Sequence, residues 1–341
     1  MADRCGVEVT EHEAFVRTRL VDQRPRALAF HEDALVDPIR GMRWTLDGQV
    51  WDPHCNWAYR FDAAALAPDG RHAFIYERCG TKGLLLRDHT ELLREVDRSF
   101  YHAHAYELPA CFWTAPDGRL LLVHCPRSYC RLDLDDVETG ERCTAAVERN
   151  PADFFHSRLA ARGRWLLDAG WVWHPLDVVL AFDLEAALAD PTLLDASSPV
   201  AAGRTGIEES QTCFLDDRRI LIASSAEPPL DEETAPAVPP LALAVVNLEG
   251  RAIERVVPFG ELAGAMMATG DGRLVCFHVH PKLVDLATGA VVLRWPDLAS
   301  GEEMSSIASG KPRPVVATDP AGARFAVADD RGIHVVALQR Q

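Results

Sequence analysis

A short turn sequence recurs along the chain and constrains the fold more than any other feature. Residues 66–71 read Leu-Ala-Pro-Asp-Gly-Arg, and residues 114–119 read Thr-Ala-Pro-Asp-Gly-Arg. Weaker copies follow, so that an arginine closes a turn about every 45–55 residues, at Arg71, Arg119, Arg164, Arg218, Arg273 and Arg324. Because Asp-Gly readily takes the positive φ of a two-residue hairpin turn, each copy predicts a hairpin between two strands.

The sequence around each turn is equally regular. A β-rich apolar run follows it, as at residues 120–123, and a third run ends at an Asp or Asn turn, as at residues 284–289. Four short strands in each repeat of this length are typical of a propeller blade. The repeats predict an all-β, seven-bladed β-propeller, with six blades as the alternative because the first unit is degenerate. Two β-sandwich domains would not explain one turn sequence at this period.

The two ends of the chain are expected to close the ring. Residues 14–16 are predicted as the first strand of the first blade, and residues 26–30 as its second strand. The last unit stops one strand short after residues 335–338, so we expect residues 6–9 to pair with the C-terminal strands. Closing the ring removes exposed strand edges. The whole chain, 1–341, is predicted to form one domain, with a single helical turn at residues 184–191.

The turn, the strand after it and the hydrophobic-Asp-hydrophobic run with Thr-Gly together resemble the WD40-like family of β-propellers, in its degenerate bacterial-type form. The resemblance covers residues 6–338. No copy has the Trp-Asp ending or the preceding Gly-His pair of a true WD40 repeat, so it does not imply the polar network that those residues build between blades. The resemblance implies a rigid ring that offers one face to a protein partner.

Residues 226–240 interrupt the pattern between the second and third strands of the fifth unit. Proline and acidic residues dominate this segment, so it cannot join a sheet and has little apolar area to bury. We predict a mobile loop here. A neutral insertion and a segment that docks a partner are both open.

The net charge excludes some classes of binding partner, and the cysteine content indicates the cellular compartment. The chain has 35 Lys and Arg against 51 Asp and Glu, a net charge of −16 at pH 7. This charge repels phosphate backbones and anionic lipids, so nucleic acid and membranes are not expected as partners. No run is apolar enough for a membrane span or a signal peptide. The nine cysteines include no CxxC pair, so we expect reduced thiols and a cytoplasmic location.

The sequence contains no GxSxG, P-loop, GxGxxG, HExxH or EF-hand signature. The candidate site is therefore the face where loops lead into the first strands and join the second strands to the third. Many of the 13 histidines and several aromatic residues fall in these loops, which suits a ligand pocket. The candidate ligand-binding residues are Trp57, His102, His104, His156, Trp171, Glu208 and Arg313.

Residues 100–107 are the sharpest local candidate. If this segment is extended, His102 and His104 point to one side, and two imidazoles can ligate zinc, copper or iron once a third donor arrives. Hydrogen bonding to neighbouring loops is the alternative role.

The sequence leaves two functions open. The first is a cytoplasmic module that presents a His- and aromatic-rich face to a protein or small-molecule partner. The second is a hydrolase or lyase assisted by a divalent transition metal at the central opening.

Overall fold

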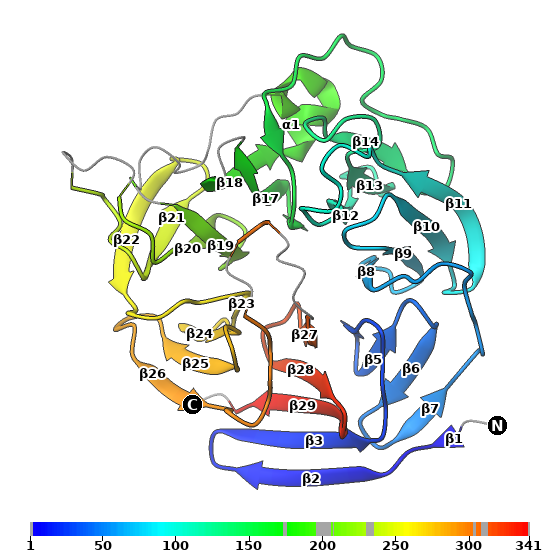
Figure 1. Cartoon of the computed structure of the whole chain (residues 1–341), viewed down its shortest axis with the longest axis vertical. Coiled ribbons are helices and arrows are strands. Elements are labelled where there is room, and N and C mark those ends of the chain that lie inside the picture. The colour runs from blue at the N-terminus through cyan, green and yellow to red at the C-terminus, as the bar shows by residue number, and fades with distance from the viewer. Residues whose placement is uncertain are drawn as a thin grey trace.

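In a computed structural model, the strands form seven separate sheets arranged as a ring around a central channel (Figure 1). The structure describes residues 3–172, 176–195, 206, 208–229, 235–302, 305–307 and 313–339. Helix within these residues is limited to α1 (Leu184–Ala189), where it was predicted, and a 3-10 helix (Pro191–Leu194). Neither could cross a membrane, and no other helix of the described chain could. The prediction of a seven-bladed propeller is confirmed.

Each blade runs from an inner strand beside the channel to an outer strand at the rim. Blade 1 contains β4 (Ala29–His31), β5 (Ala34–Asp37), β6 (Met42–Thr45), β7 (Gln49–Trp51) and β1 (Asp3–Arg4). Blade 2 contains β8 (Ala63–Leu66), β9 (His72–Tyr76), β10 (Lys82–Arg87) and β11 (Glu91–Asp97). Blade 3 contains β12 (Ala110–Thr114), β13 (Leu120–His124) and β14 (Asp133–Asp136).

The remaining four blades complete the ring. Blade 4 has an inner edge in two pieces, and contains β15 (Phe154–Phe155), β16 (Leu159–Arg162), β17 (Trp165–Val172) and β18 (Leu176–Asp183). Blade 5 contains β19 (Glu209–Phe214), β20 (Arg219–Ser224), β21 (Ala242–Asn247) and β22 (Ala252–Pro258). Blade 6 contains β23 (Met266–Ala268), β24 (Arg273–Cys276), β25 (Lys282–Asp285) and β26 (Val291–Arg294). Blade 7 contains β27 (Val315–Thr318), β28 (Arg324–Asp329), β29 (Gly332–Leu338), β3 (Phe15–Val21) and β2 (Val7–His12).

An N-terminal strand closes the ring, as predicted, but a different strand makes the contact. β3 pairs with β29 from Phe15 opposite Leu338 to Val21 opposite Gly332, and β2 pairs only with β3 at the rim (Figure 1). Residues 15 and 16 therefore belong to an outer strand of blade 7, and the prediction of residues 14–16 as the first strand of blade 1 was wrong. The prediction of residues 26–30 as the second strand of blade 1 was also wrong, because β4 is the inner strand of that blade. The reason is burial: Leu20 of β3 is fully buried against blade 1, whereas β2 is mostly exposed.

The core is a ring of interfaces between neighbouring blades. One apolar cluster fills each of the seven gaps between blades, and the strands in the middle of each blade contribute to clusters on both sides. All five residues of β9 are buried, for example. Burial on both faces explains why these strands are continuous apolar runs and do not alternate with polar residues.

The repeated Asp-Gly-Arg segments form the turns between inner and second strands, although these turns are wider than the predicted two-residue hairpin. Between β8 and β9, the Gly70 N–H donates to the Ala67 carbonyl at 2.9 Å, and the Ala67 N–H donates to the His72 carbonyl at 2.8 Å. Pro68 occupies the second position of this turn and Gly70 the fourth, the positions that a type I turn favours. The Asp69 carboxylate accepts from the Arg71 N–H at 2.8 Å.

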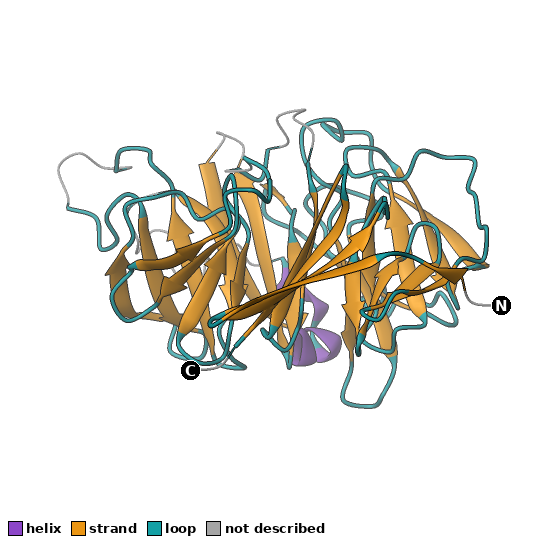
Figure 2. Ribbon diagram, turned by 90° about the horizontal axis from the view of Figure 1, so that it is seen from below, coloured by secondary structure: helices purple, strands orange, loops and turns teal. Residues whose placement is uncertain are grey.

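The two faces of the ring differ (Figure 2). We call the face with α1 and the Asp-Gly turns the lower face, and the face with the longer loops into the inner strands the upper face. The fifth-blade loop over 226–240 lies on the upper face, and its residues 230–234 fall outside the described residues. Beyond them Val238 is buried between blades 4 and 5, and the Ser224 hydroxyl donates to the Pro239 carbonyl at 2.8 Å. That end of the loop is packed against the ring.

Candidate functional site

A cavity of about 1110 Å³ is lined by inner strands and by turns of the lower face. Two further cavities of the central channel, of about 380 and 430 Å³, adjoin each other and share Leu28, Val316 and Thr318 with it. Both are lined by Tyr76, Glu107, Arg313, Pro314 and Val316, so they meet along this wall. Residues from all seven blades, or from the loops that lead into them, line one cavity or the other. Residues that are far apart in the sequence therefore face a common space.

Glu107 and Arg313 form an ion pair at the centre of this wall. Arg313 Nη1 lies 2.8 Å from Glu107 Oε2, and the Tyr76 hydroxyl donates to Glu107 Oε1 at 3.3 Å. Burial raises the pKa of Glu107, but the Arg313 and Arg78 guanidinium groups outweigh it and hold the pKa below its ordinary value. Burial and the Glu107 charge together raise the pKa of Tyr76 well above 10. Glu107 is therefore ionised and Tyr76 neutral at physiological pH.

Arg78 stands beside this pair on the loop between β9 and β10. Its backbone is fixed because its N–H donates to Asp62 Oδ1 at 2.7 Å and its carbonyl accepts from the Leu108 N–H at 2.7 Å. The side chain lines the larger cavity, and its buried Nε has no hydrogen-bond partner among the described residues. Most buried nitrogen donors have an acceptor, so this one is notable.

Arg158 faces the smaller cavity from the break between β15 and β16. Its Nε lies 3.5 Å from the Ala169 carbonyl oxygen. Burial lowers the pKa of this guanidinium, while the charges of Asp177 and Glu107 raise it. An arginine keeps its charge even when its pKa is lowered in this way, so Arg158 adds a positive charge to the channel wall.

The walls of the two cavities carry more positive than negative charge. Among the described residues, four arginines, Arg26, Arg78, Arg158 and Arg313, line them together with two carboxylates, Asp62 and Glu107. The adjoining larger cavity adds one arginine and three carboxylates, Arg324, Glu32, Asp33 and Asp319, so the described lining of all three carries equal numbers of both charges. The arginines are therefore concentrated at the upper part of the channel, while the chain as a whole has a net charge of −16.

Residues 305–307, from the long connection between β26 and β27, are attached beside the channel. The Ser306 N–H donates to the buried Asp177 carboxylate at 2.9 Å, and its hydroxyl donates to the same group. Ile307 forms a β-bridge with Tyr106. Figure 1 shows this short segment, in orange, near the inner ends of β17 and β19. It links a connection of blade 7 to blade 4 and to the loop that precedes blade 3.

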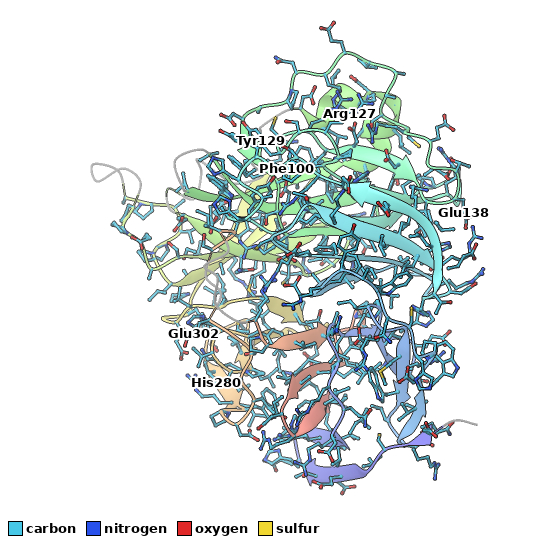
Figure 3. The ribbon with its side chains drawn as sticks, turned by 45° about the vertical axis from the view of Figure 1, so that its right-hand side comes forward. Phe100, Arg127, Tyr129, Glu138, His280 and Glu302 are labelled. Carbon is cyan, nitrogen blue, oxygen red and sulfur yellow. The ribbon has the colours of Figure 1, made fainter. Side chains whose placement is uncertain are left out.

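A stack of aromatic rings lies on the upper face beside the channel. Trp171 and Phe155 are stacked with ring centroids 3.8 Å apart, Tyr129 stacks on Phe155 at 4.3 Å, and Tyr101 contacts Tyr129 at 4.8 Å. Phe155 is fully buried, Tyr101 is 43% exposed and the neighbouring Phe100 is 83% exposed. Figure 3 labels Phe100, Tyr129 and Arg127 in this part of the molecule. We call these five residues, Phe100, Tyr101, Tyr129, Phe155 and Trp171, the aromatic shelf.

Arg98 holds the loop that carries part of this shelf. Its Nη2 donates to the carbonyls of Ala103 at 2.7 Å and Tyr106 at 2.9 Å, and its Nε donates to the Gly80 carbonyl at 2.7 Å. The guanidinium also lies 4.4 Å from the centroid of the Tyr106 ring. Because one side chain donates hydrogen bonds to all three carbonyls, the loop is held in consecutive turns.

These turns correct the expectation of an extended segment at His102 and His104. His102 has φ +49°, and its carbonyl accepts from the Ala105 N–H at 2.8 Å. The two imidazole rings lie 6.1 Å apart at an angle of 38°, with His102 half-buried and His104 exposed. Among the described residues, no three His, Cys, Asp or Glu side chains are grouped to hold a metal ion. A metal at this pair stays a prediction from the sequence.

The structure distributes the seven candidate residues over the upper half of the ring. Arg313 lines both cavities, whereas His156 is buried, with Nδ1 bonded to Asp168 and Nε2 to the Cys130 carbonyl at 3.1 Å. Trp57 packs between blades 1 and 2 and donates from Nε1 to the Ile39 carbonyl at 2.9 Å. Glu208 accepts from the backbone N–H of Asp177 at 3.1 Å. Trp171 belongs to the aromatic shelf, with His102 at its edge.

Sequence reasoning missed most of the charged groups of the channel. Glu107 appeared in it only as the last residue of a histidine-containing loop, and Tyr76, Arg78 and Arg158 were not singled out. A usable signal was present, because each residue lies at the end of a second strand, just after one or just before an inner strand, the positions that face the upper end of the channel. Without the ring geometry, nothing distinguished them from solvated loop residues.

Comparison with known proteins supports the fold. The sequence matches no protein-family model and no curated protein. The WD40 domain of Pan2 from Neurospora crassa matches the structure with a TM-score of 0.50 at 11% identity, covering 100% of this chain and 90% of that chain. The computationally designed protein Ika8 (TM-score 0.49, 11% identity, 98% and 97% coverage) and BamB from Moraxella catarrhalis (0.48, 13%, 97% and 100%) are also similar. The chain is a seven-bladed β-propeller.

Proposed function

We propose that this protein is an interaction module that binds a segment of a partner protein on its upper face, with the aromatic shelf as the main contact. The observation that carries this proposal is the exposure of Phe100 and Tyr101 on a rigid support. Large aromatic side chains are enriched among the residues that dominate binding energy at protein interfaces. Two adjacent exposed aromatic rings beside a channel suit such a contact.

The support beneath the exposed rings favours binding. Tyr101 and Tyr129 rest on the buried Phe155–Trp171 stack, and Arg98 fixes the loop that carries Phe100 and Tyr101. Preorganised side chains lose little entropy when a partner binds, which leaves more of the contact energy as affinity. The fold alone does not determine a function, since propellers serve many, so the proposal depends on this site.

A reducing compartment is part of the proposal. All nine cysteines are free thiols, as expected for a protein of the cytoplasm. The histidines add less to this face than the sequence suggested, because the candidate His156 is buried and bonded to Asp168 and to the Cys130 carbonyl. The partner surface is therefore defined by aromatic rings more than by imidazoles.

A double variant, Phe100→Ala with Tyr101→Ala, tests the proposal. The matched control is Trp51→Ala, which removes a ring that is 50% exposed on the rim strand β7. Proteins captured from an extract of the cells that express this chain are cross-linked and quantified for each form. We expect the wild type and the Trp51 variant to retain the same partner and the shelf variant to lose it. Equal retention by all three forms would contradict the proposal.

A further inference from the structure

We propose that the partner segment at the aromatic shelf is basic, and that one of its arginine or lysine side chains binds the Asp153 carboxylate while its stem packs on the neighbouring ring of Tyr129. This inference rests on the proposed function, because it takes the shelf as the contact surface and names the chemistry of the segment that binds there. It concerns the edge of the shelf just before β15, and Asp153 lines none of the three channel cavities.

Asp153 places a carboxylate at the edge of the shelf. The Tyr129 hydroxyl donates to Asp153 Oδ1 at 2.5 Å, so the charged group lies against a shelf ring. Asp153 is exposed, and no arginine, lysine or histidine among the described residues lies within ion-pair distance of it. A carboxylate can accept about four hydrogen bonds. Since Tyr129 supplies one, the group retains the capacity to bind a cation from a partner.

An exposed aspartate on the opposite face shows the contrast. Asp117, on a lower-face turn, already holds the Arg119 guanidinium at 2.7 Å. Its charge is balanced within the chain, whereas that of Asp153 is left for a partner to balance. An exposed carboxylate that lies against aromatic rings and lacks its own cation suits the recognition of a basic side chain.

The rings beside Asp153 can hold a cation as well. A guanidinium or ammonium group is attracted to the face of an aromatic ring within about 6 Å of its centroid. The described part of the chain places an arginine over the rings of Phe30, Tyr106 and Trp165, none of which belongs to the shelf. Phe100 is 83% exposed and Tyr129 is partly exposed. A partner side chain with an apolar stem and a cationic head can therefore contact both the rings and the carboxylate.

The backbone around Asp153 is fixed before any partner binds. The Asn150 N–H donates to Asp195 Oδ2 at 2.8 Å, and the Ala152 N–H donates to the Asp195 carbonyl at 3.2 Å. Asp195 is held in turn by Arg149, whose Nε donates to its Oδ1 at 2.7 Å. Because the carboxylate and the ring stack are both preorganised, little entropy is lost when they bind a partner.

The charges favour a basic segment over an acidic one. The net charge of −16 attracts cationic partners from a distance. At the shelf itself, burial and the Asp153 carboxylate raise the pKa of the Tyr129 hydroxyl, as a nearby negative charge should. Arg127, an exposed residue two positions before Tyr129, opposes this attraction. Its removal should therefore strengthen the binding of a basic segment, which tests the sign of the inference.

Selection from a displayed library of random dodecapeptides tests the inference, with the full chain as the bait. The library is first depleted on the Phe100→Ala and Tyr101→Ala variant, so that the enriched peptides depend on the shelf. We expect these peptides to contain arginine or lysine and to carry a net positive charge. Enrichment of acidic or uncharged peptides would overturn the inference and still support the proposed function. If no peptide is enriched, the shelf binds no peptide segment and both proposals fail.

Charge variants then measure the affinity for an enriched peptide by fluorescence anisotropy. Asp153→Asn should weaken binding about fivefold, because asparagine can still accept from Tyr129 and only the charge is lost. Asp117→Asn is the matched control, since it removes the same charge from the lower face and should change the affinity by less than about twofold. Arg127→Gln should tighten binding about twofold. Equal affinities of the two aspartate variants, with circular dichroism showing that both are folded, or weaker binding by Arg127→Gln, would overturn the inference.

A double-mutant cycle locates the bound cation. The cationic residue of the peptide is replaced by a neutral isostere, citrulline for arginine or acetyl-lysine for lysine. This replacement should weaken binding to the wild type about fivefold and to Asp153→Asn much less, because both changes remove the same contact. Equal weakening in the two proteins would show that the cation binds away from Asp153, and the inference would be wrong. The proposed function would then still stand on the loss of binding by the Phe100→Ala and Tyr101→Ala variant.

Discussion

Arg313 Nη1 lies 2.8 Å from Glu107 Oε2, although 206 residues separate the two in the sequence. Glu107 precedes the inner strand of blade 3, and Arg313 precedes that of blade 7. The ion pair therefore spans the channel between blades that are not neighbours. It joins the loops that precede blades 3 and 7 in one wall of the channel.

Ring closure should depend on β3 more than on β2. Leu20→Ala removes a fully buried side chain from the interface between blades 7 and 1, and we expect a loss of about 2–5 kcal/mol in the free energy of unfolding. Urea denaturation followed by tryptophan fluorescence measures it. Val9→Ala, on the exposed strand β2, should change stability by less than about 0.5 kcal/mol. Equal effects of the two substitutions would show that β2 contributes as much to closure as β3 does.

Two glycines in tight turns should respond differently to alanine. Both have positive φ, +76° at Gly289 and +86° at Gly118, so alanine is strained at each by about 1–2 kcal/mol. A Cβ on Gly289 would lie 1.9 Å from the Pro258 carbonyl oxygen, whereas a Cβ on Gly118 meets nothing within 4 Å. We expect Gly289→Ala to lower the melting temperature far more than Gly118→Ala. Similar melting curves would mean that blades 5 and 6 separate easily at this contact.

Acid should weaken the structure partly through Asp135. Burial raises the pKa of this carboxyl, but hydrogen bonds from His124 and Arg142 outweigh burial and lower it from 3.8 to about 2. A pKa that is lower in the folded state adds stability above pH 3.8, and this stability is lost as the pH falls toward 2. Allowing for solvent screening, its contribution is about 1 kcal/mol.

Asp135→Asn tests this pH dependence. We expect the variant to be less stable than the wild type at pH 6 and to differ from it much less at pH 2.5, in thermal unfolding monitored by circular dichroism. Asp217→Asn, at a side chain that is 76% exposed, is the control and should follow the wild type at both values. A constant difference between Asp135→Asn and the wild type would show that the carboxylate charge is not the stabilising feature.

The fifth-blade loop should be dispensable in part. Its sequence predicts that a Gly-Ser replacement of residues 226–240 changes stability by no more than about 1 kcal/mol. The burial of Val238 limits this expectation, since truncating a buried valine costs about 1–3 kcal/mol. A replacement of 228–235 that retains Val238 should be neutral, and Val238→Ala should be destabilising. The free energies of unfolding in urea compare the two directly.

Local sequence chemistry determined the number and type of the blades. Asp-Gly turns and continuous apolar runs repeat because every blade needs the same hairpins and has the same burial on both faces. These are short-range requirements, so they are visible in any single repeat. The helical turn at residues 184–191 follows the same rule, because Asp183 caps it through a contact with the Ala186 N–H three residues later.

Tertiary structure alone decided what closes the ring and what faces the channel. The sequence predicted residues 14–16 as a strand of blade 1, but residues 15–21 pair with β29 in blade 7, where Leu20 packs against blade 1. Likewise Arg78, Glu107, Arg158 and Arg313 resemble ordinary charged loop residues in the sequence. They line adjoining cavities because the ring brings loops from different blades to a common axis, and that convergence depends on distances that no local pattern encodes.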